Sequence, residues 1–72
     1  MSEQKRKISF TVACVNEFAN RYKMSSKEAF QYLFQFKGIA FIKENYDVEH
    51  TLDFETILDD LEILCKKNGG TL

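Results

Sequence analysis

The sequence predicts an all-α fold, a compact bundle of three to four helices with short connections. Apolar residues recur at intervals of three or four along most of the 72 residues, proline is absent, and only three glycines occur. No stretch shows the alternation of apolar and polar residues that marks a half-buried strand. Because a chain of this length forms one domain, we expect residues 1–72 to fold as a single helical domain.

The first predicted helix runs from about Glu3 to Tyr22, and Ser2 is placed to cap its start. Phe18 widens its apolar stripe, while Phe10 and Cys14 lie at the far edge. The spacing predicts that these residues form the core-facing stripe: Ile8, Val12, Val15, Ala19 and Tyr22.

The second predicted helix runs from Ser26 to about Phe36. Ser25 and Glu28 have the spacing of a capping box, in which each side chain bonds to the other residue's backbone N–H. We expect Gly38 to supply the left-handed residue that ends this helix. The expected core stripe has four members: Ala29, Phe30, Leu33 and Phe34.

A short third helix is predicted from Ile39 to about Asn45. Such a helix is too short to persist alone in water, so it depends on packing. Residues 46–51 are predicted to form a polar connector that Tyr46 and Val48 anchor.

The last predicted helix follows Asp53, which is placed as its N-cap, with Thr51 as the competing cap. Leu52 and Ile57 have the spacing of a hydrophobic staple, and residues 68–70, Asn-Gly-Gly, end the helix. Its apolar stripe is the clearest in the chain: Phe54, Ile57, Leu58, Leu61, Leu64 and Cys65.

Composition and motifs argue against an enzyme. Cys14 and Cys65 lie on apolar stripes, where a buried thiol is inert, and His50 is the single histidine. These three residues supply neither a nucleophile–base pair nor the four ligands of a zinc site. We therefore predict no catalysis, no cofactor and no metal, and we expect His50 to bond to connector backbone, with partner contact or a charge switch as the alternative.

Two cysteines cannot form a disulfide scaffold, and no apolar run approaches the roughly 20 residues of a membrane span. The first residues also lack the uninterrupted apolar stretch of a signal peptide. These features predict a cytoplasmic protein that does not enter a membrane.

The net charge of −1 conceals two opposite halves, since residues 1–37 carry +4 and residues 38–72 carry −5. A generic nucleic-acid coat would be strongly basic, so the balance disfavours nucleic acid as a partner. The opposite halves instead favour self-association or contact with a charged protein surface.

Aromatic residues gather in the second helix. If Phe30 and Phe34 face the core, then Tyr32 and Phe36 lie off the centre of the stripe and are available to a partner. The alternative is that the third or the first helix covers them. The sequence thus predicts a non-catalytic module that acts by contact with a protein partner or with a second copy of itself.

DNA binding is the alternative function. The first two helices, joined by a short turn at residues 23–25, could form a helix-turn-helix, with Lys27, Gln31 and Gln35 pointing toward bases. Against this, the same helix carries many apolar residues, and the acidic half would repel phosphates.

Four segments together resemble a known family: Ser-x-x-Glu-Ala-Phe-x-Tyr-Leu from Ser25, Lys-Gly-Ile-Ala-Phe-Ile from Lys37, Tyr-Asp-Val-Glu-His-Thr from Tyr46, and Leu58-Asp59-Asp60-Leu61. The chain is similar, from about Phe10 to Lys67, to small uncharacterised helical domains from bacteria such as Firmicutes and Bacteroidetes. The family pattern has an apolar residue before the histidine, where this chain has Glu49, which does not suit a core position.

This resemblance implies a cytosolic helical domain without known enzymatic activity. Members of the family are often encoded beside a protein that looks like an ADP-ribosyltransferase-type toxin, which implies an antitoxin-like or accessory role. On this chain the resemblance makes Tyr46, His50 and Thr51 candidate partner-binding residues beside Tyr32 and Phe36.

Overall fold

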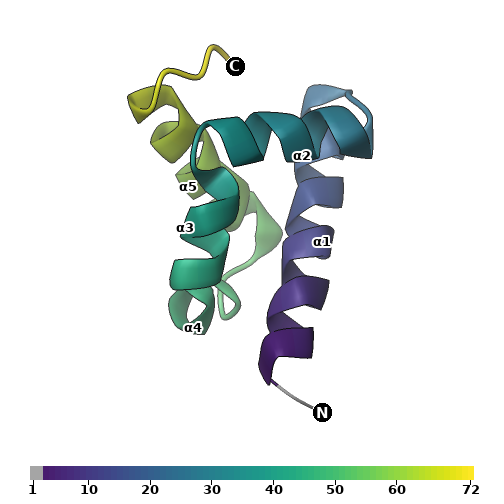
Figure 1. Ribbon diagram of the computed structural model, residues 1–72, viewed down its shortest axis with the longest axis vertical. Coiled ribbons are helices and arrows are strands. Elements are labelled where there is room, and N and C mark those ends of the chain that lie inside the picture. Colours follow the sequence, from purple (N-terminus) through teal and green to yellow (C-terminus); the bar gives the residue numbers. More distant parts are fainter. Residues whose placement is uncertain (1–2) are drawn as a thin grey trace.

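The computed structural model describes residues 3–72 as five helices, and no strand occurs among these residues (Figure 1). The all-α prediction is confirmed, and the predicted Ser2 cap lies outside the described residues. The helices are α1 (Glu3–Tyr22), α2 (Ser26–Gln35), α3 (Gly38–Glu44), α4 (Tyr46–Glu49) and α5 (Phe54–Lys67).

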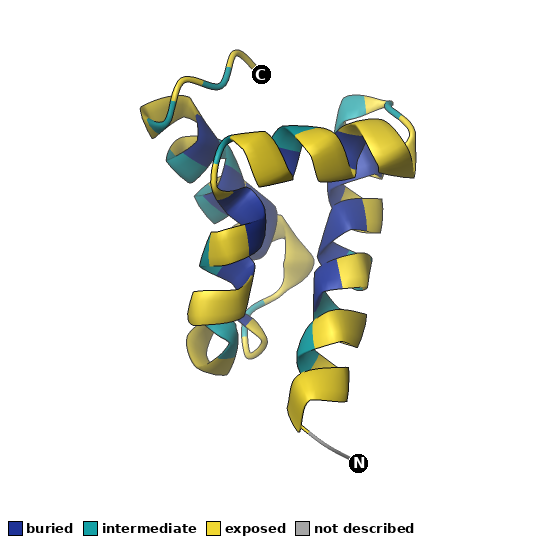
Figure 2. Ribbon diagram, viewed as in Figure 1, coloured by how far each residue is buried: buried dark blue, intermediate teal, exposed yellow. Residues whose placement is uncertain are grey.

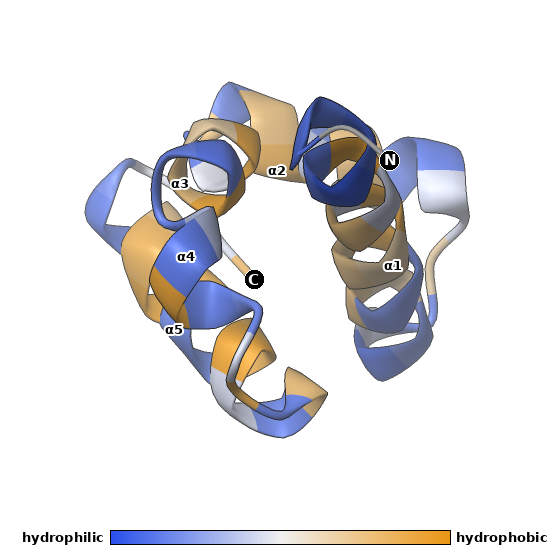
Figure 3. Cartoon of the chain, turned by 90° about the horizontal axis from the view of Figure 1, so that it is seen from below, coloured by the Kyte–Doolittle hydropathy of each residue, from blue (hydrophilic) through white to orange (hydrophobic). Residues whose placement is uncertain are grey.

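Helix α2 lies across one end of α1 and α3, while α5 packs against both of them (Figure 1). Seen along the other direction, α1 stands on one side, α3, α4 and α5 stand on the other, and α2 joins the two (Figure 3). The radius of gyration is 11.3 Å, which matches the value of about 11 Å expected for a compact domain of this length.

The core is drawn from α1, α2, α3 and α5 (Figure 2). On α1 the buried face is centred on Cys14 and Phe18, both fully buried. The prediction that Ile8 and Val12 face the core is wrong. The face of α1 that turns inward is centred nearer to Cys14 than the predicted stripe, and it leaves these two side chains exposed. The largest fully buried side chains are Phe18, Leu33, Ile42, Ile57, Leu61, Cys14 and Cys65.

Two predicted helix starts are confirmed in atomic detail. At α2 the Glu28 N–H donates to Ser25 Oγ at 3.1 Å, and the Ser25 N–H donates to Glu28 Oε1 at 2.9 Å. At α5 the Thr56 N–H donates to Asp53 Oδ1 at 2.8 Å, which makes Asp53 the cap. These bonds satisfy N–H groups that a helix start leaves unpaired, and they fix the residue at which each helix begins.

The junction between α2 and α3 differs from the prediction. The left-handed residue is Lys37, with φ of 69°, and not Gly38. Gly38 instead begins α3 and is buried against Leu33, where an added Cβ would lie 2.7 Å from Leu33 Cδ2. The glycine is needed because the two helices approach closely there, and not because of its φ.

The connector predicted at residues 46–51 contains the one-turn helix α4. Its N–H groups continue the helical pattern from α3, since the Glu49 N–H donates to the Asn45 carbonyl at 2.8 Å. The prediction that Val48 anchors the connector is wrong, because Val48 is 61% exposed. The residue that turns inward is Glu49, which is 5% exposed.

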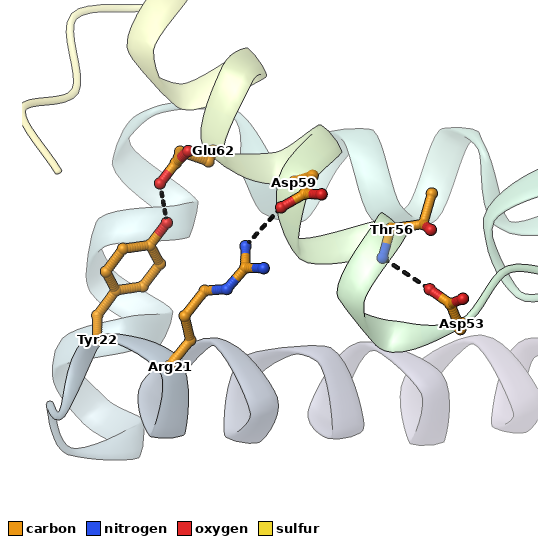
Figure 4. A network of polar contacts seen from close by, with 6 residues as sticks. All are labelled: Arg21, Tyr22, Asp53, Thr56, Asp59 and Glu62. Atoms are coloured by element: carbon orange, nitrogen blue, oxygen red, sulfur yellow. Dashed lines mark hydrogen bonds and ion pairs between the residues drawn. The ribbon is translucent and has the colours of Figure 1, made fainter.

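Two polar contacts join α1 to α5 (Figure 4). Arg21 Nη1 lies 2.9 Å from Asp59 Oδ1, and the Tyr22 hydroxyl donates to the Glu62 carboxylate. Burial, together with the bond to Glu62, raises the pKa of Tyr22 to about 12, so the hydroxyl keeps its proton. The basic and acidic halves of the chain therefore meet within one molecule.

Candidate partner-binding surface

Four large apolar side chains remain uncovered on the outer side of α1 and α2. On α1, Ile8 and Val12 are 54% and 53% exposed, and on α2, Phe30 and Phe34 are 46% and 68% exposed. We call these four residues the apolar surface. Apolar side chains grouped in this way mark contact sites more often than singly exposed ones do.

The phase of α2 explains why its two phenylalanines face outward. Ala29 and Leu33 are fully buried, and the next residue in each case is turned about 100° around the helix. The prediction that Phe30 and Phe34 belong to the core is therefore wrong. Their rings stack on each other with centroids 6.0 Å apart and an angle of 5° between their planes, so they form one continuous aromatic row on the outer side of α2.

Three adjoining hollows deepen the apolar surface into what we call the α1–α2–α3 groove. A hollow of about 530 Å³ lies between α1 and α2. It shares Val12 and Phe30 with a second hollow of about 250 Å³, which reaches Ile39 on α3. The second shares Ile8 and Lys43 with a third, of about 230 Å³, toward the start of α1. The hollows thus form one continuous feature.

The charged residues that line this groove all have one sign. They are Lys7, Lys27 and Lys43, and no aspartate or glutamate lines any of the three hollows within residues 3–72. Where the groove meets the start of α2, Ser26 Oγ donates to Asn16 Oδ1 at 2.8 Å. This bond holds α2 against α1 and keeps the groove in shape.

The predicted contact residues Tyr32 and Phe36 are half-buried and pack against the core. The Tyr32 ring stacks on Phe18 of α1 with centroids 5.8 Å apart, so the first helix does cover it. The chain after α5 lies over the same side, because the Leu72 N–H donates to the Tyr32 hydroxyl at 3.2 Å. Contacts within the chain therefore account for the positions of both aromatic side chains.

The other predicted residues lie together on and just after α4, at the opposite end of the molecule from α2 (Figure 1). The His50 ring stacks on Tyr46 with centroids 4.5 Å apart, and its Nδ1 lies 2.6 Å from the Tyr46 carbonyl oxygen. The Thr51 hydroxyl donates to the Val48 carbonyl at 2.7 Å. These local bonds give His50 and Thr51 a structural role, as expected for His50.

Glu49 is a feature that the sequence did not predict. Its side chain is buried, and Oε1 has no hydrogen-bond partner among the described residues. Burial first, and then a hydrogen bond with Asp60 and its negative charge, raise the pKa of Glu49 to about 7. A carboxyl group therefore occupies a position at the core, which the sequence did not lead us to expect.

The two cysteine thiols are free and buried in the core. Burial raises the pKa of Cys14 to about 12 and that of Cys65 to about 11, with the Glu49 charge contributing at Cys14. No group of three or more His, Cys, Asp or Glu among residues 3–72 is placed to hold a metal ion. None of the helices in this part of the chain is both long and apolar enough to cross a membrane.

The fold and the surface define a small all-α domain with an apolar, lysine-lined groove. The model of the family described as protein of unknown function (DUF3791) matches residues 9–68, and the chain belongs to this family. Comparisons with curated proteins and with solved structures gave no match. The match confirms the resemblance to a family of unknown function.

Proposed function

We propose that this protein is a small non-catalytic module that binds another protein chain through the α1–α2–α3 groove. The observation that carries the proposal is Phe34, whose side chain is 68% exposed beside Phe30 on an ordered helix. Covering a large apolar side chain releases about 1.5–3 kcal/mol, so a partner that covers it gains affinity. Aromatic anchors among other apolar residues are typical of interface hot spots.

An antitoxin-like or accessory role in the bacterial cytoplasm is the more specific form of this proposal. The sequence resemblance supports it, since similar proteins are often encoded beside an ADP-ribosyltransferase-like toxin. A domain with buried, unreactive thiols suits regulation by contact, in which the module covers part of its partner. Tyr46, His50 and Thr51 offer a second contact surface at α4, beside the exposed Val48.

Co-purification with matched variants tests the proposal. A tagged protein is recovered from its source cell in wild-type form, as Phe34→Ser, and as Ile63→Ser, which alters a large apolar residue on α5 that is 55% exposed. We expect one protein to co-purify in comparable amount with the wild type and with Ile63→Ser, and to be lost with Phe34→Ser. Identical recovery with all three forms contradicts the groove as the contact site.

DNA binding is the second candidate, because Lys27 and Gln31 are exposed on α2, where the helix-turn-helix alternative needs them. A mobility shift at increasing salt separates the two functions. DNA binding that weakens steeply with salt and disappears with Lys27→Glu would replace our proposal.

Self-association is tested by light scattering at low and high salt. A mass above that of the monomer is required if the partner is a second copy of the chain.

A further inference from the structure

We infer that the occupant of the α1–α2–α3 groove is an amphipathic helix that carries acidic residues on both sides of its apolar stripe. This inference rests on the proposed function and specifies its partner. It is carried by the combination of a continuous apolar surface with charged lining residues that, among the described residues, are all lysines. One of these lysines, Lys7, has its Nζ 4.0 Å from Glu3 Oε1, one turn earlier on α1. Opposite charge at the edges of an apolar contact steers association and selects among partners.

The walls of the groove favour a helix over an extended strand. All three walls are helices, whose backbone N–H and C=O groups are bonded within each helix, so no sheet edge is offered. The apolar residues on two walls are spaced one helical turn apart, Ile8 with Val12 and Phe30 with Phe34. Rows with this spacing match the i, i+4 spacing of side chains on a guest helix.

The dimensions agree with a short helix. The lining on α1 extends from Gln4 to Asn16, which is about 18 Å at 1.5 Å per residue. A guest of about 12 residues covers this length. The hollow of about 250 Å³ beneath Phe34 is open and shallow, so it suits an inserted apolar side chain better than an enclosed small molecule.

A second copy of this chain fits the groove less well. A symmetric pair places the same surface on both copies, which brings the lysines Lys7, Lys27 and Lys43 toward their own counterparts. A head-to-tail pair needs the acidic side of α5, where Asp59 and Glu62 already bind α1. An acidic helix from another protein meets neither difficulty.

Two synthetic peptides of about 14 residues test the inference. Both carry leucines at one helical stripe on an alanine background, and they differ in having glutamates or lysines beside that stripe. Fluorescence anisotropy of the labelled peptides is measured with the full chain at about 50 and about 300 mM salt. We expect the glutamate peptide to bind about 10-fold more tightly at low salt, with a smaller ratio at high salt.

Variants show where and why the peptide binds. Phe34→Ser should weaken both peptides, whereas the control Ile63→Ser should weaken neither. The double variant Lys27→Glu, Lys43→Glu should reverse the preference between the peptides. Both lysines are exposed, so we expect the fold to persist, and circular dichroism checks that it does.

Several results would overturn the inference. One is equal or tighter binding of the lysine peptide to the wild-type chain, and another is a preference that the double charge reversal leaves unchanged. Absence of binding by the glutamate peptide up to about 1 mM also overturns it. If both peptides bind equally and depend on Phe34, the charge preference fails while the proposed function stands.

An anionic membrane surface is a different partner that attracts lysines and apolar side chains. Vesicles of phosphatidylcholine and phosphatidylserine are therefore sedimented with the wild type and with Phe34→Ser. We expect no sedimentation of either, because the chain carries a net charge of −1 and so has no overall attraction to an anionic surface. Sedimentation of the wild type that is lost with Phe34→Ser would assign the surface to a membrane and reject the helix.

Discussion

Glu49 at the end of α4 and Asp60 in α5 place two carboxyl groups within hydrogen-bonding reach at the edge of the core. Two carboxylates at this distance repel each other, and burial weakens the solvation of the charge on Glu49. One proton shared between them relieves both effects. The protonated form of Glu49 is therefore the one that the folded chain favours.

Stability should depend on pH through Glu49. Its pKa is about 7 in the folded chain against 4.5 for an ordinary glutamate, so the folded state holds the proton more tightly. The resulting stabilisation is complete below pH 4.5 and is lost as the pH rises through 7. Glu49→Gln should therefore raise the free energy of unfolding at pH 8 by about 1–3 kcal/mol and change it far less at pH 4.5.

Urea denaturation followed by circular dichroism at the two pH values measures this effect. Glu44→Gln is the control, because it alters an exposed side chain on α3 and should change stability little at either pH value. If Glu49→Gln shifted stability by the same amount at both pH values, the proposed burial of a titrating carboxyl would be wrong.

Lys37→Gly should stabilise the protein by about 1 kcal/mol. Lys37 has φ of 69°, a conformation that disfavours any residue with a Cβ and suits glycine. The gain appears as a higher midpoint of thermal unfolding. Lys66→Gly, at a helical position of α5, should lower that midpoint, since glycine is a poor helix former. A loss of stability with Lys37→Gly would contradict the left-handed conformation.

Gly70→Ala should destabilise the protein by about 1–3 kcal/mol. An added Cβ would collide with the Tyr32 hydroxyl and would lie 2.9 Å from the Cys65 carbonyl oxygen. That carbonyl accepts the Gly70 N–H at 2.8 Å, so the end of α5 would have to open. In a Tyr32→Phe background the penalty should shrink, while Thr71→Ala, at an exposed neighbour, should have little effect in either background.

The two thiols should react slowly with a disulfide reagent in the native state. Cys14 and Cys65 are fully buried, and burial raises both pKa values, so little thiolate is present near neutral pH. In denaturant both should react at the rate of free cysteine. Rapid labelling of either thiol in the folded chain would reopen the possibility of a nucleophile.

Much of the fold was predictable from local chemistry. The serine and aspartate caps, the glycine-rich end of α5 and the long helical stripes all depend on neighbours within one helix. The outward phase of Phe30 and Phe34 was not predictable, because the apolar residues of α2 cover a wide arc of the helix and more than one phase buries part of them. The choice depends on Phe18 and the chain near Gly70, which cover Tyr32 and Phe36 and leave the other flank bare.

The candidate site was harder to predict for the same reason. Tyr46, His50 and Thr51 were singled out by a family pattern, but their local bonds within α4 depend on a helical turn that the polar sequence did not predict. The signal that could have marked the groove was present. Lys27, Phe30 and Phe34 share one side of α2, and a lysine beside two phenylalanines on one face is unusual for a core-facing stripe.

The contacts of Arg21 with Asp59 and of Tyr22 with Glu62 also bear on the order of folding. They join residues about 40 positions apart and so close a long loop, whereas α1 with α2 and α2 with α3 are consecutive helices joined by short turns. The groove is built wholly from residues 4–43, before α5 begins. We expect the transition state to contain the α1–α2–α3 packing, so that Leu33→Ala slows folding while Leu61→Ala mainly speeds unfolding.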